Sequence, residues 1–151
     1  MEALDRRIVS LLAADGRMSF ADLARKVGLS TSAAHQRVKR LEERGIITGY
    51  RAVVDHAAVG LPLTALVSVV PFDPAAPDDI PERLEHIPEI VSCWSVAGDE
   101  NYVLLVRVAR PQELEDLLAR IRTEGSCSTN TTVVLSTPWE GRPVEVPEEP
   151  V

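Results

Sequence analysis

Apolar side chains recur with helical spacing three times within the first fifty residues, and the breaks between these segments are short. Such a pattern predicts a compact bundle of short helices. Asp15-Gly16 ends the first segment, Ser19 opens the second as an N-cap, Gly28 closes it, and Gly45 ends the third. The expected inner faces are Leu4, Ile8, Leu11 and Leu12 in the first helix, Phe20, Leu23, Ala24 and Val27 in the second, and Ala34, Val38 and Leu41 in the third.

The second and third predicted helices are joined by a short turn at Gly28, and the third is amphipathic and basic. This is the helix-turn-helix arrangement, whose second helix can enter the major groove of DNA, which is about 12 Å wide. Residues 46–53 have the pattern of two short strands around a glycine, which would form a small wing. The sequence therefore predicts a winged helix-turn-helix domain over residues 1–50.

The outer faces of the third predicted helix carry the groups that DNA recognition needs. Phosphates flank the groove, so arginine and lysine supply affinity and register, while shorter polar groups near the helix N-terminus reach base edges. The predicted DNA-binding residues are Ser30, Thr31, Ser32, His35, Gln36, Arg37, Lys39 and Arg40. The alternative is a merely solvated amphipathic helix, but the preceding helix, turn, caps and wing together favour double-stranded DNA.

Charge divides unevenly along the chain. The net charge of 151 residues is -7, yet residues 1–50 hold nine basic and six acidic side chains, a balance of +3 that leaves -10 for the remainder. Such asymmetry favours contact of the first part with a polyanion. No apolar run approaches the roughly 20 residues of a membrane helix, and the start lacks the layout of a signal peptide, so we expect a cytoplasmic protein. Cys93 and Cys127 are too few for a disulfide framework.

The pattern changes to strands after a predicted linker, residues 51–61. Strands are expected over residues 63–72, 90–97, 102–109 and 129–137. Two helices lie between them, one with the stripe Ile80, Leu84 and Ile87, the other beginning at Pro111 with Leu114, Leu117, Leu118 and Ile121 inward. The order β-α-β-β-α-β predicts an α+β fold, with a ferredoxin-like sandwich over residues 62–137 and both helices on one face of its sheet.

The other face of that sheet also carries apolar residues. Leu66, Val70, Ile90, Trp94 and alternate members of residues 103–108 cannot all point at two short helices. We therefore expect a homodimer made by packing sheets, with a buried cavity or cover by the tail as alternatives. The tail, residues 138–151, is rich in proline and glutamate, and it is either disordered or supplies residues 143–147 as an extra edge strand on a partner.

Several segments of the chain together resemble the Lrp/AsnC, or feast/famine, family of transcription regulators. They are Leu4–Ile8, Gly16–Ser19, Leu23–Ser30, Arg37–Ile47, Gly49–Tyr50, Gly98–Asp99 followed by Tyr102, and Thr131–Leu135. The resemblance implies an N-terminal DNA-binding domain, a linker strand and a C-terminal ligand-sensing domain that dimerises by sheet packing. It also implies further assembly, commonly to octamers, and a small effector, usually an amino acid, that binds between dimers.

The same resemblance places the effector site. It assigns the turn Gly98, Asp99, Glu100 and Asn101, together with Thr129 and Thr131 on the last strand. Backbone N–H groups in a glycine turn can hold a carboxylate, and an acidic or amide oxygen can accept from an ammonium group. The chain departs from many relatives, which carry a carboxylate in place of Asn101 and an apolar or aromatic residue in place of Glu100. The alternative is that these residues only form a hairpin turn.

Two other functions compete with a regulator that responds to an amino acid. Siroheme decarboxylases resemble this family in both domains and act through histidine and arginine, but His35, His56 and His86 fall outside any evident sensor-domain pocket. No metal-spaced cluster, nucleophile motif or phosphate-binding loop is present, so no catalytic residue, metal or cofactor is expected. The third possibility is a ligand-binding partner that no longer contacts DNA, against which the retained arginines argue.

Overall fold

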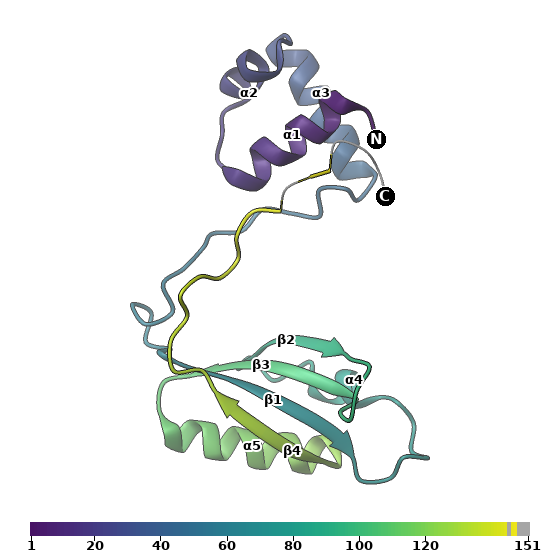
Figure 1. The fold of residues 1–151 in the computed structure, drawn as a ribbon, viewed down its shortest axis with the longest axis vertical. Helices are drawn as coiled ribbons and strands as arrows, with labels where there is room; N and C mark the ends of the chain where they lie inside the picture. The colour runs from purple at the N-terminus through teal and green to yellow at the C-terminus, as the bar shows by residue number, and fades with distance from the viewer. Residues whose placement is uncertain (145, 148–151) are drawn as a thin grey trace. The chain divides into compact units, whose positions relative to one another are not determined.

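The computed structural model describes residues 1–144, 146 and 147, which divide into two compact units (Figure 1). The first comprises residues 1–53 with the described tail from Trp139 onward, and the second comprises residues 54–138. No helix among the described residues is long and apolar enough to cross a membrane.

The first unit contains three helices, α1 (Ala3–Ala14), α2 (Phe20–Val27) and α3 (Thr31–Glu43). Ser19 and Ser30 cap α2 and α3 by accepting hydrogen bonds from the N–H groups of Asp22 and Ala33. Gly28 ends α2 with φ at +71°, a conformation that glycine adopts without steric penalty. The core of the unit consists of Ile8, Leu12, Leu23, Val38 and Leu41.

Two expectations for this unit are wrong. Phe20 is 38% exposed instead of buried, because it is the first residue of α2 and packs edge-on against His35 outside the core. The wing strands do not form over residues 46–53. Instead, the N–H groups of Ile46 and Ile47 both donate to the Leu41 carbonyl, and their side chains pack on the core. The segment is therefore bound to the end of α3. An isolated two-stranded ribbon is marginal, and this anchoring is the stronger alternative.

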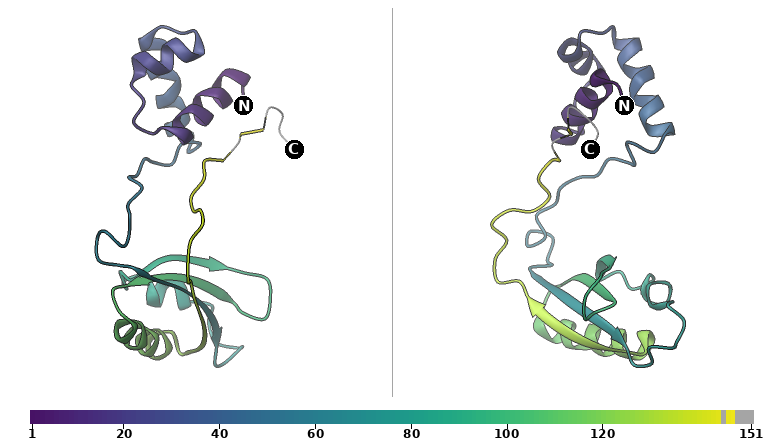
Figure 2. Two further views of the ribbon diagram at one scale, coloured as in Figure 1. Left: turned by 60° about the vertical axis from the view of Figure 1, so that its left-hand side comes forward. Right: turned by 45° about the vertical axis from the view of Figure 1, so that its right-hand side comes forward.

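The second unit is the expected β-α-β-β-α-β sandwich. Its antiparallel strands lie in the order β2-β3-β1-β4, and its two helices lie on the same side of the sheet (Figure 2). The elements are β1 (Leu63–Pro71), α4 (Ile80–Leu84), β2 (Ile90–Ser95), β3 (Tyr102–Val108), α5 (Pro111–Gly125) and β4 (Cys127–Val133). The last strand begins two residues earlier than expected and ends well before residue 137.

The register of the sheet separates a covered face from a free one. Ala65, Val67 and Val69 of β1 are buried against the helices, whereas Leu66 and Val70 on the other face are 36% and 37% exposed. Antiparallel partners share a face, so Trp94, Val103 and Leu105 join Leu66 and Val70 on the free side. We call these five residues the free sheet face.

Ile90 does not belong to the free sheet face. A bulge between Ile90 and Ser92 shifts the register of β2, so Ile90 pairs with Val106 and packs on the helix side. One extra residue in a strand exchanges the faces of the residues on either side of it.

The segments that border the second unit contain no strand among their described residues. Residues 51–61 hold only a turn, so the linker strand implied by the resemblance does not form in the isolated chain. The described residues of the tail are likewise without a helix or strand, and part of the expected edge strand over residues 143–147 lies outside the described residues.

Candidate DNA interface and effector pocket

The N-terminal half of α3 presents a polar surface. Ser30, Thr31, Ser32, His35, Gln36, Lys39 and Arg40 are all exposed, and only Arg37 among the predicted DNA-binding residues is partly buried. The hydroxyl oxygens of Ser30 and Ser32 lie 3.3 Å apart at the capped start of the helix. Short polar groups therefore lie together where a recognition helix carries its base-reading residues.

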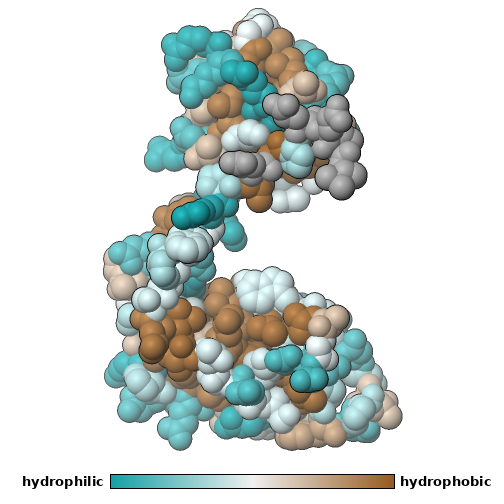
Figure 3. All heavy atoms as spheres, viewed as in Figure 1, coloured by the Kyte–Doolittle hydropathy of each residue, from teal (hydrophilic) through white to brown (hydrophobic). Residues whose placement is uncertain are grey.

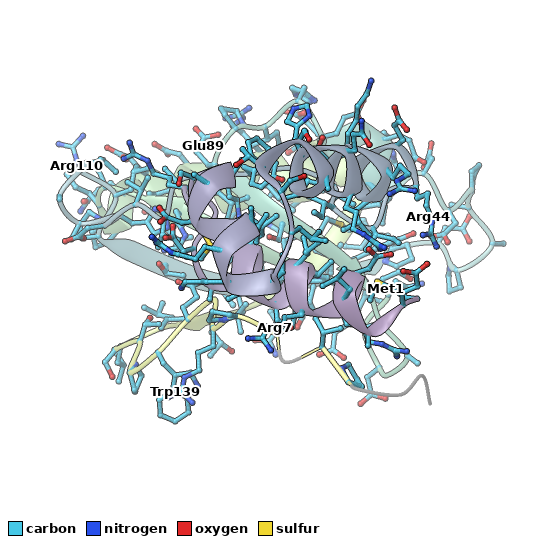
Figure 4. The ribbon with its side chains drawn as sticks, turned by 90° about the horizontal axis from the view of Figure 1, so that it is seen from above. Met1, Arg7, Arg44, Glu89, Arg110 and Trp139 are labelled. Atoms are coloured by element: carbon cyan, nitrogen blue, oxygen red, sulfur yellow. The ribbon has the colours of Figure 1, made fainter. Side chains whose placement is uncertain are left out.

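Basic groups extend this surface toward the C-terminal end of α3. Lys39 forms an exposed ion pair with Glu43, at 3.7 Å, whereas Arg40 has no ion pair among the described residues. Arg44, at the end of the helix, points outward (Figure 4). An exposed guanidinium without an internal partner is available to phosphate.

His35 contacts the neighbouring helix. Its ring lies 4.8 Å from that of Phe20, centroid to centroid, in an edge-on arrangement with an interplanar angle of 73°. Phe20 begins α2, so this contact links the two helices of the helix-turn-helix on their exposed side.

Arg37 points toward α1. Its Nη1 atom donates to Asp5 Oδ1 at 2.7 Å and to Glu2 Oε2 at 2.8 Å. The bond to Asp5, with the second bond to Glu2, raises the pKa of Arg37 further above its ordinary value. The sequence could have indicated this placement, since Arg37 lies three residues after Ala34 and four before Leu41, at the edge of the inner stripe.

A pocket of about 200 Å³ lies beside the turn between β2 and β3. Its lining consists of Asp78, Ser95, Val96, Ala97, Gly98, Glu100, Asn101 and Tyr102. Three of the four predicted turn residues therefore line it, and Asp99 is exposed outside it. The turn is held by the Val96 N–H, which donates to the Asn101 carbonyl, and by the Asn101 N–H, which donates to the Val69 carbonyl.

Carboxylates flank the pocket on two sides. Glu100 Oε1 accepts a hydrogen bond from Ser68 Oγ at 3.0 Å. Asp78 Oδ1 accepts from the hydroxyl of Tyr102 at 2.5 Å, and this bond, together with burial, raises the pKa of Tyr102 to about 12. Asp78 precedes α4 by two residues and was missed by the sequence analysis, because nothing in the sequence indicates which loop folds back against the turn.

Thr129 and Thr131 lie elsewhere in the sheet. They pair with Val69 and Val67 and share the helix-covered face, on the strand at one edge. Arg122 Nη1 donates to Thr129 Oγ1 at 3.3 Å. Val69 also pairs with Tyr102, so the threonines and the turn lie at one end of the sheet, but neither threonine lines the pocket.

A second depression, of about 230 Å³, lies in the first unit. Leu12, Gly16, Arg17, Met18, Phe20, Glu42 and Tyr50 line it. The hydroxyl of Tyr50 donates to Glu42 Oε1 at 3.0 Å, and burial together with this bond raises the pKa of Tyr50 to about 12. Among the described residues, no group of three histidine, cysteine or acidic side chains could hold a metal ion. His86 instead pairs with Glu124 at 2.9 Å.

Known proteins match both units. Residues 1–48 match the winged helix-turn-helix DNA-binding family, and residues 64–144 match the Lrp/AsnC ligand binding domain. This combination defines a two-domain, DNA-binding transcription regulator. The chain belongs to the Lrp/AsnC family.

Individual relatives agree with this assignment. The chain is 52% identical over 142 residues to the HTH-type transcriptional regulator LrpA of Mycobacterium tuberculosis, with 94% of this chain and 95% of the relative covered. It is 36% identical over 139 residues to the leucine-responsive regulatory protein of Haemophilus influenzae, with 89% and 84% covered. A feast or famine regulatory protein from M. tuberculosis, solved in complex with L-methionine, superimposes with a TM-score of 0.93 at 52% identity, covering 95% and 97% of the two chains.

The relatives also decide between the competing functions. They are named as transcriptional regulators and not as enzymes, which confirms the expectation of a non-enzymatic role.

Proposed function

We propose that the protein is a sequence-specific, cytoplasmic regulator whose α3 enters the major groove and whose assembly or operator affinity responds to a small effector, an amino acid. The observation that carries the DNA part is the exposed polar N-terminal half of α3, followed by the unpaired guanidinium of Arg40. Thr31, Ser32, His35 and Gln36 are assigned to base edges, with Ser30 at the cap. Lys39 and Arg40 are assigned to phosphates.

Salt-dependent gel shifts with DNA from upstream of the protein's own gene test this placement. Arg40→Ala removes one phosphate contact, so the slope of log affinity against log salt falls by about 0.9. Arg110→Ala, an exposed arginine of the second unit, is the matched control and leaves the slope unchanged. Equal slopes for both variants would show that α3 does not contact DNA.

The pocket beside the turn supports an amino-acid effector. Backbone N–H groups at Gly98 suit a carboxylate, and the oxygens of Glu100, Asn101 and Asp78 suit an ammonium group. A solved relative was crystallised with L-methionine. The neutral amide of Asn101 accepts hydrogen bonds without a counter-charge, so the carboxylates of Glu100 and Asp78 carry the proposed attraction.

Calorimetric titration with L-methionine, L-leucine and a panel of other amino acids identifies the effector. Glu100→Gln weakens binding of a zwitterion by about tenfold, because a charged hydrogen bond is replaced by a neutral one. Glu115→Gln, on the exposed side of α5, is the control. Binding that is unchanged in Glu100→Gln would exclude this pocket, and Thr129 and Thr131 would then be the remaining candidates, reached from a neighbouring subunit.

The free sheet face supports the proposed homodimer. Leu66 and Val70 on β1 and Trp94 on β2 are exposed, and Val103 and Leu105 of the intervening β3 lie between them on the same face. Apolar residues gather over the strands in Figure 3. A contiguous patch of this kind typically marks an interface. We propose that dimers assemble further to octamers and that the effector shifts this equilibrium. Light scattering with and without each amino acid measures the mass of the assembly.

A further inference from the structure

An ion pair between helices holds α3 at its middle. A single guanidinium, that of Arg37, joins the carboxylates of Asp5 and Glu2 at the start of α1. Glu2 is exposed, whereas Asp5 is only 8% exposed. A buried carboxylate requires a charged or hydrogen-bonding partner, and Arg37 supplies one from 32 residues further along the chain.

The position of Arg37 on the helix differs from that of the other basic residues. Ala34 and Leu41, three residues before it and four after it, are both buried, so Arg37 borders the packed face of α3. Gln36 and Arg40 are four residues apart and exposed. Some polar side chains of α3 are therefore exposed on its outer surface, whereas Arg37 forms ion pairs with α1 at the edge of the packed face.

We infer that Arg37 is a positioning residue for DNA recognition, which fixes the orientation of α3 against α1 and makes no phosphate contact. This inference rests on the proposed role of α3 as the helix that enters the groove. A phosphate contact would draw the guanidinium away from both carboxylates and leave Asp5 buried without a partner. Short side chains reach base edges only from one orientation of the helix, so a loosened α3 discriminates less between sequences.

Replacement of Asp5 separates positioning from electrostatics by the sign of the effect. Asp5→Asn removes a negative charge from a DNA-binding domain, which by electrostatics alone tightens binding. Loss of the partner of Arg37 instead weakens binding to upstream DNA by about tenfold, the size of coupling expected within one ion-pair network. Tighter binding by Asp5→Asn would overturn the inference.

Replacement of Arg37 is the second test of the inference. Arg37→Gln weakens binding to a similar extent with an unchanged salt slope, and the double variant with Asp5→Asn binds no more weakly than either single variant. A slope that falls by about 0.9 in Arg37→Gln would show a phosphate contact and overturn the inference. Arg37→Lys, which keeps the charge but loses the planar fork, recovers part of the affinity and serves where the glutamine variant does not fold.

Discrimination distinguishes positioning from simple stabilisation. The variants are compared at a temperature where circular dichroism shows them folded, on upstream DNA and on a scrambled fragment of equal length. If Arg37 positions α3, the variants have a lower ratio of affinity for upstream DNA to affinity for the scrambled fragment. A ratio equal to that of the natural protein would show that Arg37 contributes to stability alone and would overturn the inference. Arg40→Ala, measured in parallel, reports separately on whether α3 contacts DNA at all.

Discussion

The two units of the chain differ in how they use their surfaces. The first buries a small core of five side chains and exposes basic and polar groups along α3. The second buries fourteen side chains among its described residues and still leaves an apolar sheet face open. It also carries most of the negative charge of the chain.

The basic charge of the first unit and the open apolar face of the second favour different kinds of partner. A polyanion is attracted to the first and repelled by the second. The uncovered apolar residues of the second suit another protein surface, most simply a second copy of the chain. The proposed DNA contacts and the proposed dimer surface belong to units with separate cores, so we expect substitutions to weaken one function at a time.

The largest effect is expected from a cavity in the smaller core. Leu23→Ala lowers the free energy of unfolding by about 2–5 kcal/mol, which a core of five side chains tolerates poorly. We expect the variant to lose DNA binding while its mass by light scattering is unchanged. Ile121→Ala, the matched change in the larger core, should weaken assembly first. A single shared calorimetric transition that both variants lower would show that the units do not fold separately.

A charge on the free sheet face should separate the subunits. Leu66→Asp removes about 1.5–3 kcal/mol of apolar burial and places a carboxylate in the proposed interface, which raises the dissociation constant of the dimer at least about a hundredfold. Ala119→Asp, on the exposed side of α5, is the control. If Leu66→Asp keeps the mass of the natural protein, another surface makes the dimer.

The sequence predicted the elements well because each rests on local patterns. The cap at Ser19, the end of α2 at Gly28 and the strand that begins at Leu63 are set by neighbouring residues, and the structure confirms them. Where expectations are wrong, contacts outside the predicted element decide the outcome. Ile46 and Ile47 fold onto the end of α3 in place of a wing.

The site was less predictable for the same reason. The turn from Gly98 to Asn101 was found, but Asp78 reaches the pocket from a loop twenty residues before Gly98. The bulge that moves Ile90 to the helix side depends on pairing with β3 and leaves no signal in the sequence of β2 itself. Sequence spacing could have separated Arg37 from the outer face of α3, but not identified Asp5 as its partner.

Ser19 and Ser30 cap the two helices of the helix-turn-helix in the same way, but only Ser30 belongs to the proposed DNA interface. Ser19→Ala and Ser30→Ala each remove an acceptor from a helix N-terminus and lower the free energy of unfolding by about 1 kcal/mol. Only Ser30 lies on the proposed interface, so only its variants weaken DNA binding once stability is accounted for. Ser30→Asp should restore the cap but not the affinity, because it places a carboxylate beside phosphates. Full affinity in Ser30→Asp would place the interface further along α3.

The chain has two tyrosines, one in each unit. The smallest expected effect is a difference in how their surroundings raise the pKa of each phenol. The pKa of each is raised to about 12, by burial first at Tyr50 and by the bond to Asp78 first at Tyr102. The folded state thus favours the neutral phenol. Its contribution to stability is complete below a pH of about 10, the ordinary tyrosine pKa, and is lost as the pH rises toward 12.

Tyrosinate absorbance after rapid jumps to alkaline pH, before unfolding, measures both groups. Tyr102→Phe and Tyr50→Phe assign the two titrations to their units. Because the carboxylate dominates at Tyr102 and burial at Tyr50, Asp78→Asn should lower the pKa of Tyr102 more than Glu42→Gln lowers that of Tyr50. The reverse order would mean that Asp78 does not hold the Tyr102 hydroxyl, and that this wall of the proposed effector pocket lies open in solution.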